Sequence, residues 1–327
     1  MERSFALLLQ LTSILQQQHL AAALQAPRVL DVDGLAKAGI ARLRERGAVV
    51  TEGLGAASLA EAIVAHEAVI VRSASTLTKD LLSSGAAASL RCVGRAGVGV
   101  DNIDTAAAAA LGLPVVTSAG ASTRAVVELT IGHLLQAARR LGDADAAVKR
   151  GDFAAFKAGA AETASELGGK RLGLLGFGRI AKETARVAGA LGMDVSVYSP
   201  GADAAAAAAV GADLAASPAA LFASCTHVAL QCALTDETRG LVDLDLIRSM
   251  PAPGPRVLVN VARGGVAVEA DVAAALANGD LDAYATDVFD DEPGCRGSSP
   301  LFRGGAPGVF ATPHVGAATR EAQDGVA

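Results

Sequence analysis

The chain has 327 residues, enough for two domains that each bury a core, which excludes a small scaffold held by disulfides or metal. Hydrophobic residues make up 51% of it and aromatic residues only 3%, so its cores must consist of Ala, Val and Leu, as in helices layered on a parallel sheet. The net charge of −6, without a block of Lys or Arg, argues against nucleic acid as a partner.

The first 26 residues and the cysteines bear on the cellular compartment. Residues 1–26 contain an apolar run from Phe5 to Leu15, and two interpretations stay open: a cleaved leader, to an organelle for example, or an ordinary N-terminal extension. The run is too short and too polar to span a membrane, so we expect no membrane partner. Four scattered cysteines without metal-ligand spacing predict a reducing, cytoplasmic compartment and no metal site.

Short apolar runs alternate with helical stretches from Arg28 onward, which predicts a first α/β unit over residues 27–120. Its five expected strands are Val29-Leu30, Ala48 to Val50, Ala68 to Val71, Leu90 to Val93 and Pro114 to Val116. A long helix from Thr123 to Arg140 then leads into a second unit over 121–312. The apolar face of this helix should contain Val127, Ile131, Leu134 and Leu135.

The second unit is organised around a strand, a glycine turn and a helix. After a surface segment from Arg150 to Ser165, the apolar run Arg171 to Leu175 predicts a buried strand. The turn Gly176-Phe177-Gly178-Arg179-Ile180-Ala181 fits the dinucleotide-binding pattern, with alanine as its third small residue. Gly176 would make the tight turn, and Gly178 would let backbone N–H groups reach a pyrophosphate.

The helix after this turn should bury Ile180, Val187 and Leu191 against a sheet. A second strand, Asp194 to Tyr198, places Ser199 where such folds meet the adenosine ribose. The remaining expected strands are Val228 to Leu230, Arg256 to Val259, Ala283 to Thr286 and Gly308 to Ala311. We interpret the alanine tracts 106–110 and 204–209 as helices without a function.

Polar residues follow three of these strands, at the edge where open α/β sheets bind ligands. Arg263 precedes two glycines and could hold a carboxylate through two hydrogen bonds, although a surface arginine at a turn would look the same. Asp287 to Pro293 is an acidic turn that could equally be a solvated run of charge. His314 lies behind a proline, and a lone histidine is more often structural than catalytic. The other four histidines, His19, His66, His133 and His227, we interpret as surface or core residues.

Five segments together resemble the signatures of the D-isomer-specific 2-hydroxyacid dehydrogenases, in order and in spacing. They are Gly94 to Asp104, the glycine turn at Gly176, Asn260 to Gly265, Asp287 to Pro293, and Thr312 to Thr319. The chain looks closest to the D-3-phosphoglycerate dehydrogenase branch over about residues 28–325. The resemblance implies two doubly wound parallel-sheet domains, a Rossmann-type NAD-binding domain inserted into a flavodoxin-like substrate domain. Residues 313–327 would return to the substrate domain and stop where the family continues a helix, which predicts a truncated end.

The resemblance also implies a catalytic set of Arg263, Glu292 and His314. His314 would exchange a proton with the substrate, Glu292 would favour its protonated form, and Arg263 would clamp the substrate. The implied substrate residues are Arg72, Ser73, Ala74, Gly97, Val98 and Gly99. The implied cofactor residues are Gly176, Gly178, Arg179, Ile180, Ser199, Cys232, Ala233, Val261, Ala262, Asp287 (at the nicotinamide amide) and Gly316.

Several positions depart from the family pattern. Ser199 replaces the usual aspartate, so a 2′-phosphate would not be repelled, but no arginine follows to bind one; NAD is favoured and NADP stays open. Gln231 and Ala233 replace the usual histidine and proline near the adenine, which should loosen that wall. An insertion around 155–161 displaces the phosphate-binding arginine, with Lys157 as a stand-in.

The predicted reaction is the oxidation of D-3-phosphoglycerate to 3-phosphohydroxypyruvate, a step of serine biosynthesis. Two alternatives stay open: reduction of hydroxypyruvate or glyoxylate, and a catalytically silent NAD-binding regulator. The family implies a homodimer formed through the nucleotide domain, by way of the helix from Thr123.

Overall fold

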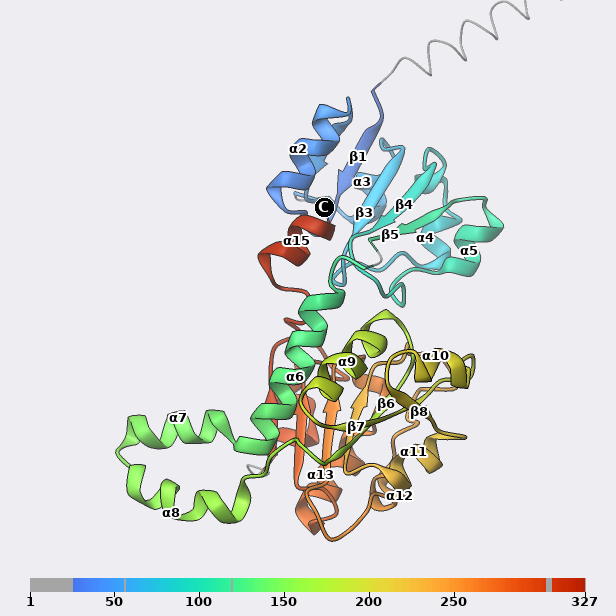
Figure 1. Cartoon of the computed structure of the whole chain (residues 1–327). Coiled ribbons are helices and arrows are strands. Elements are labelled where there is room, and N and C mark those ends of the chain that lie inside the picture. The colour runs from blue at the N-terminus through green and yellow to red at the C-terminus, as the bar shows by residue number, and fades with distance from the viewer. Residues whose placement is uncertain (1–25, 56, 119, 304–307, 327) are drawn as a thin grey trace, which may run out of the picture. The chain divides into compact units, whose positions relative to one another are not determined.

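The computed structural model describes residues 26–55, 57–118, 120–303 and 308–326, and these form two compact units, each built on its own parallel sheet (Figure 1). The first unit contains the described residues up to 118 together with 324–326, and the second is Gly120–Gln323. The turn after His314 is hydrogen-bonded to Asp287 within the second unit. The open question about residues 1–25 falls outside the described residues.

The first unit contains the five predicted strands in the order β2-β1-β3-β4-β5, all parallel, which is the flavodoxin-like arrangement. Its strands are β1 (Arg28–Asp31), β2 (Val49–Glu52), β3 (Ala68–Val71), β4 (Cys92–Arg95) and β5 (Val115–Thr117). Its helices are α2 (Lys37–Glu45), α3 (Leu59–Ile63), α4 (Lys79–Leu82) and α5 (Thr105–Ala110). Side chains of Ser58, Thr78 and Asp104 accept a backbone N–H at the starts of α3, α4 and α5, which fixes where these helices begin.

The second unit contains a parallel sheet in the order β12-β11-β10-β9-β6-β7-β8. Its strands are β6 (Arg171–Leu175), β7 (Asp194–Tyr198), β8 (Ala212–Leu214), β9 (His227–Leu230), β10 (Val257–Asn260), β11 (Ala283–Thr286) and β12 (Val309–Ala311). Strand β8 was not predicted, because it has three residues and two of them are exposed. Strands β7 and β8 are added on one side of β6 and strands β9 to β12 on the other, and this change of side creates the crevice where such folds bind nucleotides.

Helices cover both faces of this sheet. Helices α6 (Thr123–Arg139), α9 (Arg179–Ala190) and α10 (Ala204–Ala208) share one buried cluster with it. Helices α11 (Pro218–Ser224), α12 (Leu244–Arg248) and α13 (Glu269–Asn278) share the other, and α14 (Cys295–Ser298) and α15 (Arg320–Val326) follow. None of the helices in the described ranges has the length and apolar character to cross a bilayer.

The predicted surface segment from Arg150 to Ser165 is mostly helical. Helices α7 (Leu141–Arg150) and α8 (Phe153–Thr163) form a hairpin, drawn in light green in Figure 1, with the turn at Gly151 in the left-handed conformation. The segment was correctly placed at the surface, since α8 buries none of its side chains. Its alanines favour helix on intrinsic propensity, and the prediction gave the glycines too much weight.

The predicted buried face of α9 was wrong. Val187 and Leu191 are 38% and 42% exposed, whereas the small residues Ala181, Thr184, Ala185 and Ala188 are buried. Ala181 must face the sheet because the turn needs a small residue where helix and strand approach closely, and this sets the rotation of the whole helix. The buried face is therefore chosen by size rather than by hydrophobicity.

Candidate active site

The site residues predicted in the second unit follow the carboxyl ends of five of its strands. Gly176 follows β6, Ser199 follows β7, Arg263 follows β10, Asp287 follows β11 and His314 follows β12. Because these strands are parallel, the loops after them lie along one edge of the sheet, which is where open α/β sheets bind ligands.

The glycine turn fits a dinucleotide pyrophosphate. Gly176 has a φ of +111°, and a Cβ there would lie 2.5 Å from the backbone oxygen of Gln231, so only glycine is tolerated where the residues after β6 pass close to those after β9. Gly178 immediately precedes the twelve-residue helix α9, and no described atom lies within 4 Å of where its Cβ would be. Open space thus lies beside a helix N-terminus, the arrangement that binds phosphate. Arg179 and Ile180 form the first turn of α9, and Ser199 is half-buried directly after β7.

The residues expected near the adenine differ in exposure. The Gln231 amide donates hydrogen bonds to the hydroxyls of Thr130 on α6 and Thr184 on α9, at 3.1 and 3.0 Å, so this side chain connects two helices to the end of β9. Cys232 is half-buried, and burial raises the pKa of its thiol to about 11. Ala233 is exposed.

The loop that carries Arg263 is held by Asn260, the last residue of β10. The Asn260 side chain is fully buried; it accepts a hydrogen bond from Ala262 N at 3.0 Å and donates one to Arg263 O at 2.9 Å. A Cβ on Gly264 would lie 2.1 Å from the carbonyl carbon of Phe289, so glycine allows this loop to pack directly on the acidic turn. Val261 and Ala262, both expected at the cofactor, pack into the two cores of the unit.

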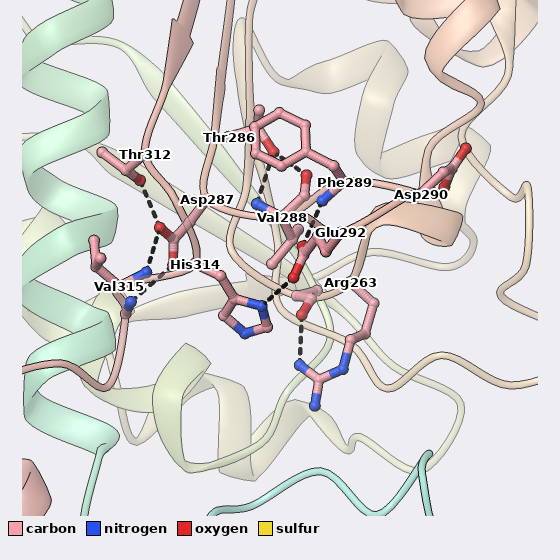
Figure 2. A network of polar contacts seen from close by, with 12 residues as sticks. Arg263, Thr286, Asp287, Val288, Phe289, Asp290, Glu292, Thr312, His314 and Val315 are labelled. Carbon is pink, nitrogen blue, oxygen red and sulfur yellow. Dashed lines mark hydrogen bonds and ion pairs between the residues drawn. The ribbon is translucent and has the colours of Figure 1, made fainter. Parts of the chain in front are cut away.

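His314 and Glu292 are in contact: the imidazole Nδ1 lies 2.6 Å from Glu292 Oε2 (Figure 2). The other carboxylate oxygen of Glu292 accepts a hydrogen bond from Phe289 N at 2.7 Å, which fixes the carboxylate toward the ring. A cavity of about 580 Å³ adjoins the pair and is lined largely by apolar side chains, among them Phe302 and Pro313. The geometry therefore couples one imidazole to one oriented carboxylate.

Each partner shifts the pKa of the other. The hydrogen bond that the His314 imidazole donates to Glu292 raises the pKa of His314, an effect that burial opposes. Burial by itself would raise the pKa of Glu292, but hydrogen bonds from His314 and from Phe289 N outweigh it and lower that pKa. Each shift therefore favours the charged form of its own group, an imidazolium beside a carboxylate.

Asp287 organises the turn that carries His314. Its Oδ1 accepts hydrogen bonds from the Thr312 hydroxyl at 2.6 Å and from Val315 N at 2.8 Å, and its Oδ2 accepts one from Gly316 N at 2.8 Å (Figure 2). The Asp287 side chain is only 2% exposed. Within this turn His314 has a φ of +52°, a left-handed conformation that is uncommon for residues other than glycine. The carboxylate thus holds the backbone in a conformation that it would seldom adopt alone.

One residue of this network was not recognised from the sequence. His133 of α6 is 3% exposed, and its Nε2 lies 3.2 Å from the Thr312 hydroxyl. It was interpreted as a surface or core residue, and it is indeed buried. Its position three residues after Thr130, on the face of α6 that also buries Thr130, was the available signal.

The first unit holds its own candidate loops at the ends of β3 and β4. Asp33 accepts hydrogen bonds from Arg72 N at 2.6 Å, Ser75 N at 3.2 Å and the Ser75 hydroxyl at 2.6 Å. Asn102 donates its amide to Arg72 O at 2.6 Å from the other side. The predicted substrate segment Arg72 to Ala74 is therefore fixed by two side chains that the sequence did not identify as its supports.

The loop after β4 contains the other predicted substrate residues. Gly97 has a φ of +154°, and a Cβ there would overlap the Arg95 guanidinium at 2.0 Å. Val98 is 43% exposed, and Gly99 follows it. Only glycine at position 97 leaves room for the buried Arg95 side chain.

Comparisons with known proteins agree with this arrangement. Residues 131–316 match the family model described as the D-isomer specific 2-hydroxyacid dehydrogenase, NAD binding domain. A D-3-phosphoglycerate dehydrogenase of Methanocaldococcus jannaschii is 37% identical over 90% of this chain and 54% of its own length. The chloroplastic D-3-phosphoglycerate dehydrogenase 2 of Arabidopsis thaliana is 38% identical over 93% of this chain and 47% of its own length.

Among solved structures, the holo form of D-mandelate dehydrogenase from Rhodotorula graminis has a TM-score of 0.82 at 26% identity and covers 93% of this chain and 92% of its own. The chain spans about half the length of the curated relatives it matches.

Proposed function

This chain belongs to the D-isomer-specific 2-hydroxyacid dehydrogenase family, and from that premise we propose that it is an NAD-dependent oxidoreductase acting on a D-2-hydroxy acid. The observation that carries the proposal is the 2.6 Å contact between His314 and Glu292 at the edge of the sheet that holds the NAD-binding turn. An oriented imidazole can move a proton near neutral pH, and the neighbouring Arg263 loop supplies a group for an anionic substrate. We assign residues 27–120 to a substrate domain and 121–312 to the nucleotide domain.

The roles of the three residues follow from their chemistry. A bound nicotinamide would accept or give the hydride. Because Glu292 bonds to Nδ1 of His314, the proton exchanged with the substrate oxygen is placed on Nε2. Glu292 holds the ring and stabilises its charged form, and Arg263 clamps the substrate carboxylate and polarises the oxygen at C2.

The NAD-binding residues are proposed from the same edge of the sheet. Backbone N–H groups from Gly178 to Ile180 would hold the pyrophosphate, and Ser199 would meet the adenosine ribose. Asp287 would meet the nicotinamide amide. We favour NAD over NADP because no arginine or lysine follows Ser199 in the segment that leads to Asp203.

For the substrate we propose D-3-phosphoglycerate, since the curated relatives named above are D-3-phosphoglycerate dehydrogenases. Lys157, the candidate phosphate ligand, is exposed on α8. Reduction of hydroxypyruvate or glyoxylate is the alternative, and a silent NAD-binding regulator is the second. All three residues of the catalytic set are present, which argues against the regulator.

Absorbance at 340 nm tests the proposal. Purified protein is given NAD with D-3-phosphoglycerate, and in parallel NADH or NADPH with hydroxypyruvate or glyoxylate; His314→Ala is the control for background turnover. We expect oxidation of D-3-phosphoglycerate at a higher kcat/KM than that of either reduction. Faster reduction of hydroxypyruvate than oxidation of D-3-phosphoglycerate would favour hydroxypyruvate as the substrate. Tight NADH binding by calorimetry without any turnover would favour the silent NAD-binding regulator over the enzyme.

We also propose a cytoplasmic homodimer formed through the nucleotide domain, by way of α6. Leu135 of this helix is 38% exposed, an apolar side chain available to a second copy. Light scattering after size exclusion should give twice the chain mass of 32.5 kDa, and a monomer would contradict the proposal.

A further inference from the structure

A continuous chain of hydrogen bonds runs from the core of the second unit to the turn that carries His314. It begins at the imidazole of His133 on α6, passes through the Thr312 hydroxyl and ends on the Asp287 carboxylate, with donor–acceptor distances of 3.2 and 2.6 Å. His133 is 3% and Asp287 2% exposed, so water competes little for either group. The carboxylate in turn holds Val315 N and Gly316 N, on the far side of His314.

The direction of these bonds follows from the groups involved. An ionised carboxylate only accepts, so the single hydroxyl proton of Thr312 points to Asp287. The hydroxyl oxygen therefore accepts from His133, whose Nε2 must carry a proton. Burial lowers the pKa of His133, which favours the neutral ring, and this bond selects its Nε2–H tautomer.

From this geometry we propose that His133 is a positioning residue for His314, acting through Thr312 and Asp287. It fixes the Thr312 hydroxyl toward Asp287, and Asp287 then holds the left-handed backbone at His314. His133 itself touches neither substrate nor cofactor in this account. The inference rests on the proposed function only in treating His314 as the acid-base group.

The consequence is electrostatic as well as geometric. The charged groups of the second unit that act on the His314 ring are Glu292, Asp287 and Arg263. Glu292 and Asp287 raise the pKa of His314, and both effects depend on where the turn places the ring. Loosening the turn at Thr312 should therefore let the pKa of His314 fall toward its ordinary value.

The decisive experiment measures the pKa of His314 directly in the cofactor-free protein, by NMR titration of the histidine Cε1–H signals. The His314 signal is assigned from its loss in a His314→Asn variant. His133→Leu removes the donor at similar volume, and His133→Gln keeps an N–H donor where Nε2 was. His66→Leu is the matched control, since it removes another buried histidine, one whose Nε2 lies 2.9 Å from the Thr51 hydroxyl in the first unit.

We expect the pKa of His314 to fall by about half a pH unit in His133→Leu, as for the loss of one modest hydrogen bond. His133→Gln and His66→Leu should leave it unchanged. Thr312→Val should lower it at least as far, and the double variant of His133→Leu with Thr312→Val should titrate like Thr312→Val alone, because the effect passes through that hydroxyl. With an accepted substrate, kcat should fall severalfold in His133→Leu and recover in His133→Gln.

An unchanged His314 titration in a folded His133→Leu variant would overturn the inference. If that variant does not fold, an unchanged titration in Thr312→Val would overturn it equally. The NMR readout needs no turnover, so a protein inactive on every 2-hydroxy acid would contradict the proposed function and leave this test intact.

Discussion

The two sheets use their carboxyl edges in opposite ways. The edge of the seven-stranded sheet presents charged side chains, with His314 and Glu292 in contact 2.6 Å apart. At the edge of the five-stranded sheet, the Asp33 carboxylate accepts hydrogen bonds from Arg72 N and from the Ser75 hydroxyl, and so holds the segment between them. The carboxyl edge of a parallel sheet therefore presents charged side chains in one unit and holds a backbone segment in the other. A parallel sheet determines where a ligand binds, and the loop residues determine what the edge does with it.

Removal of His314 is expected to have the largest effect, because it removes the chemistry proposed for the edge of the seven-stranded sheet. His314→Ala should lower kcat by about 10³-fold, since it removes the acid-base group, while cofactor affinity by calorimetry stays nearly unchanged. Turnover near that of the wild type would remove His314 from its role.

Glu292→Gln keeps the size of the side chain but removes its charge, so it should lower the pKa of His314. The pH profile of kcat/KM should therefore shift to lower pH.

The opposite edge of the seven-stranded sheet offers a histidine whose pKa is shifted in the other direction. His227, the first residue of β9, is fully buried, and burial lowers its pKa to about 4. Because this pKa lies below the unfolded value of about 6.5, the unfolded chain binds more protons between those values, and stability falls as pH decreases through that window. The loss should reach about 3 kcal/mol by pH 4 in urea denaturation.

His227→Leu should flatten this acid-side slope without changing the pH profile of turnover. His314 has the opposite sign: its raised pKa stabilises the fold below about pH 6.5, and the contribution is lost as pH rises through the folded pKa. An identical acid-side slope in His227→Leu and the wild type would contradict the assignment.

Replacement of Asp33 sharpens the comparison from the side of the first unit. Asp33→Ala removes three hydrogen bonds from the segment Arg72 to Ser75, so KM should rise about tenfold while kcat changes little. Asp104→Ala is the matched control, because that carboxylate caps α5 through Ala107 N and, within the described residues, makes no side-chain hydrogen bond to the segment Arg72 to Ser75. It should lower stability by about 1 kcal/mol and leave KM alone. Equal KM values in the two variants would show that the segment does not depend on Asp33.

The smallest expected effect comes from adding a carboxylate at position 199, directly after β7. Ser199→Asp adds a carboxylate where the adenosine ribose is proposed to lie, so NAD should bind about fivefold tighter through new hydrogen bonds, and NADP more weakly by repulsion. Dissociation constants for both cofactors by calorimetry test this. Tighter binding of NADP would place the ribose elsewhere.

Most of the fold was predictable because parallel strands buried on both faces leave short apolar runs between glycines. The runs at Arg171 to Leu175 and Ala283 to Thr286 coincide with β6 and β11. Strand β8 and the rotation of α9 were missed for physical reasons: β8 is short and half-exposed, and α9 packs through alanines whose small size, rather than their hydrophobicity, decides the face.

The site was less predictable than the fold, because its supports are distant in the sequence. The motifs placed His314 and Glu292 on neighbouring loops, and the structure joins them. Asp33 lies 39 residues from Arg72, and His133 lies 179 residues from Thr312, so no local pattern connects either pair. A buried polar side chain on a helix face indicates that it has a partner, but only the fold identifies it.

The three hydrogen bonds on Asp287 have a consequence for amide exchange with deuterated solvent. Val315 and Gly316 belong to a turn with exposed neighbours, where rapid exchange would be the ordinary expectation, yet both N–H groups are held by one carboxylate. Their protection should therefore exceed that of the neighbouring amides. The turn thus contains two backbone protons whose slow exchange depends on a carboxylate that solvent barely reaches.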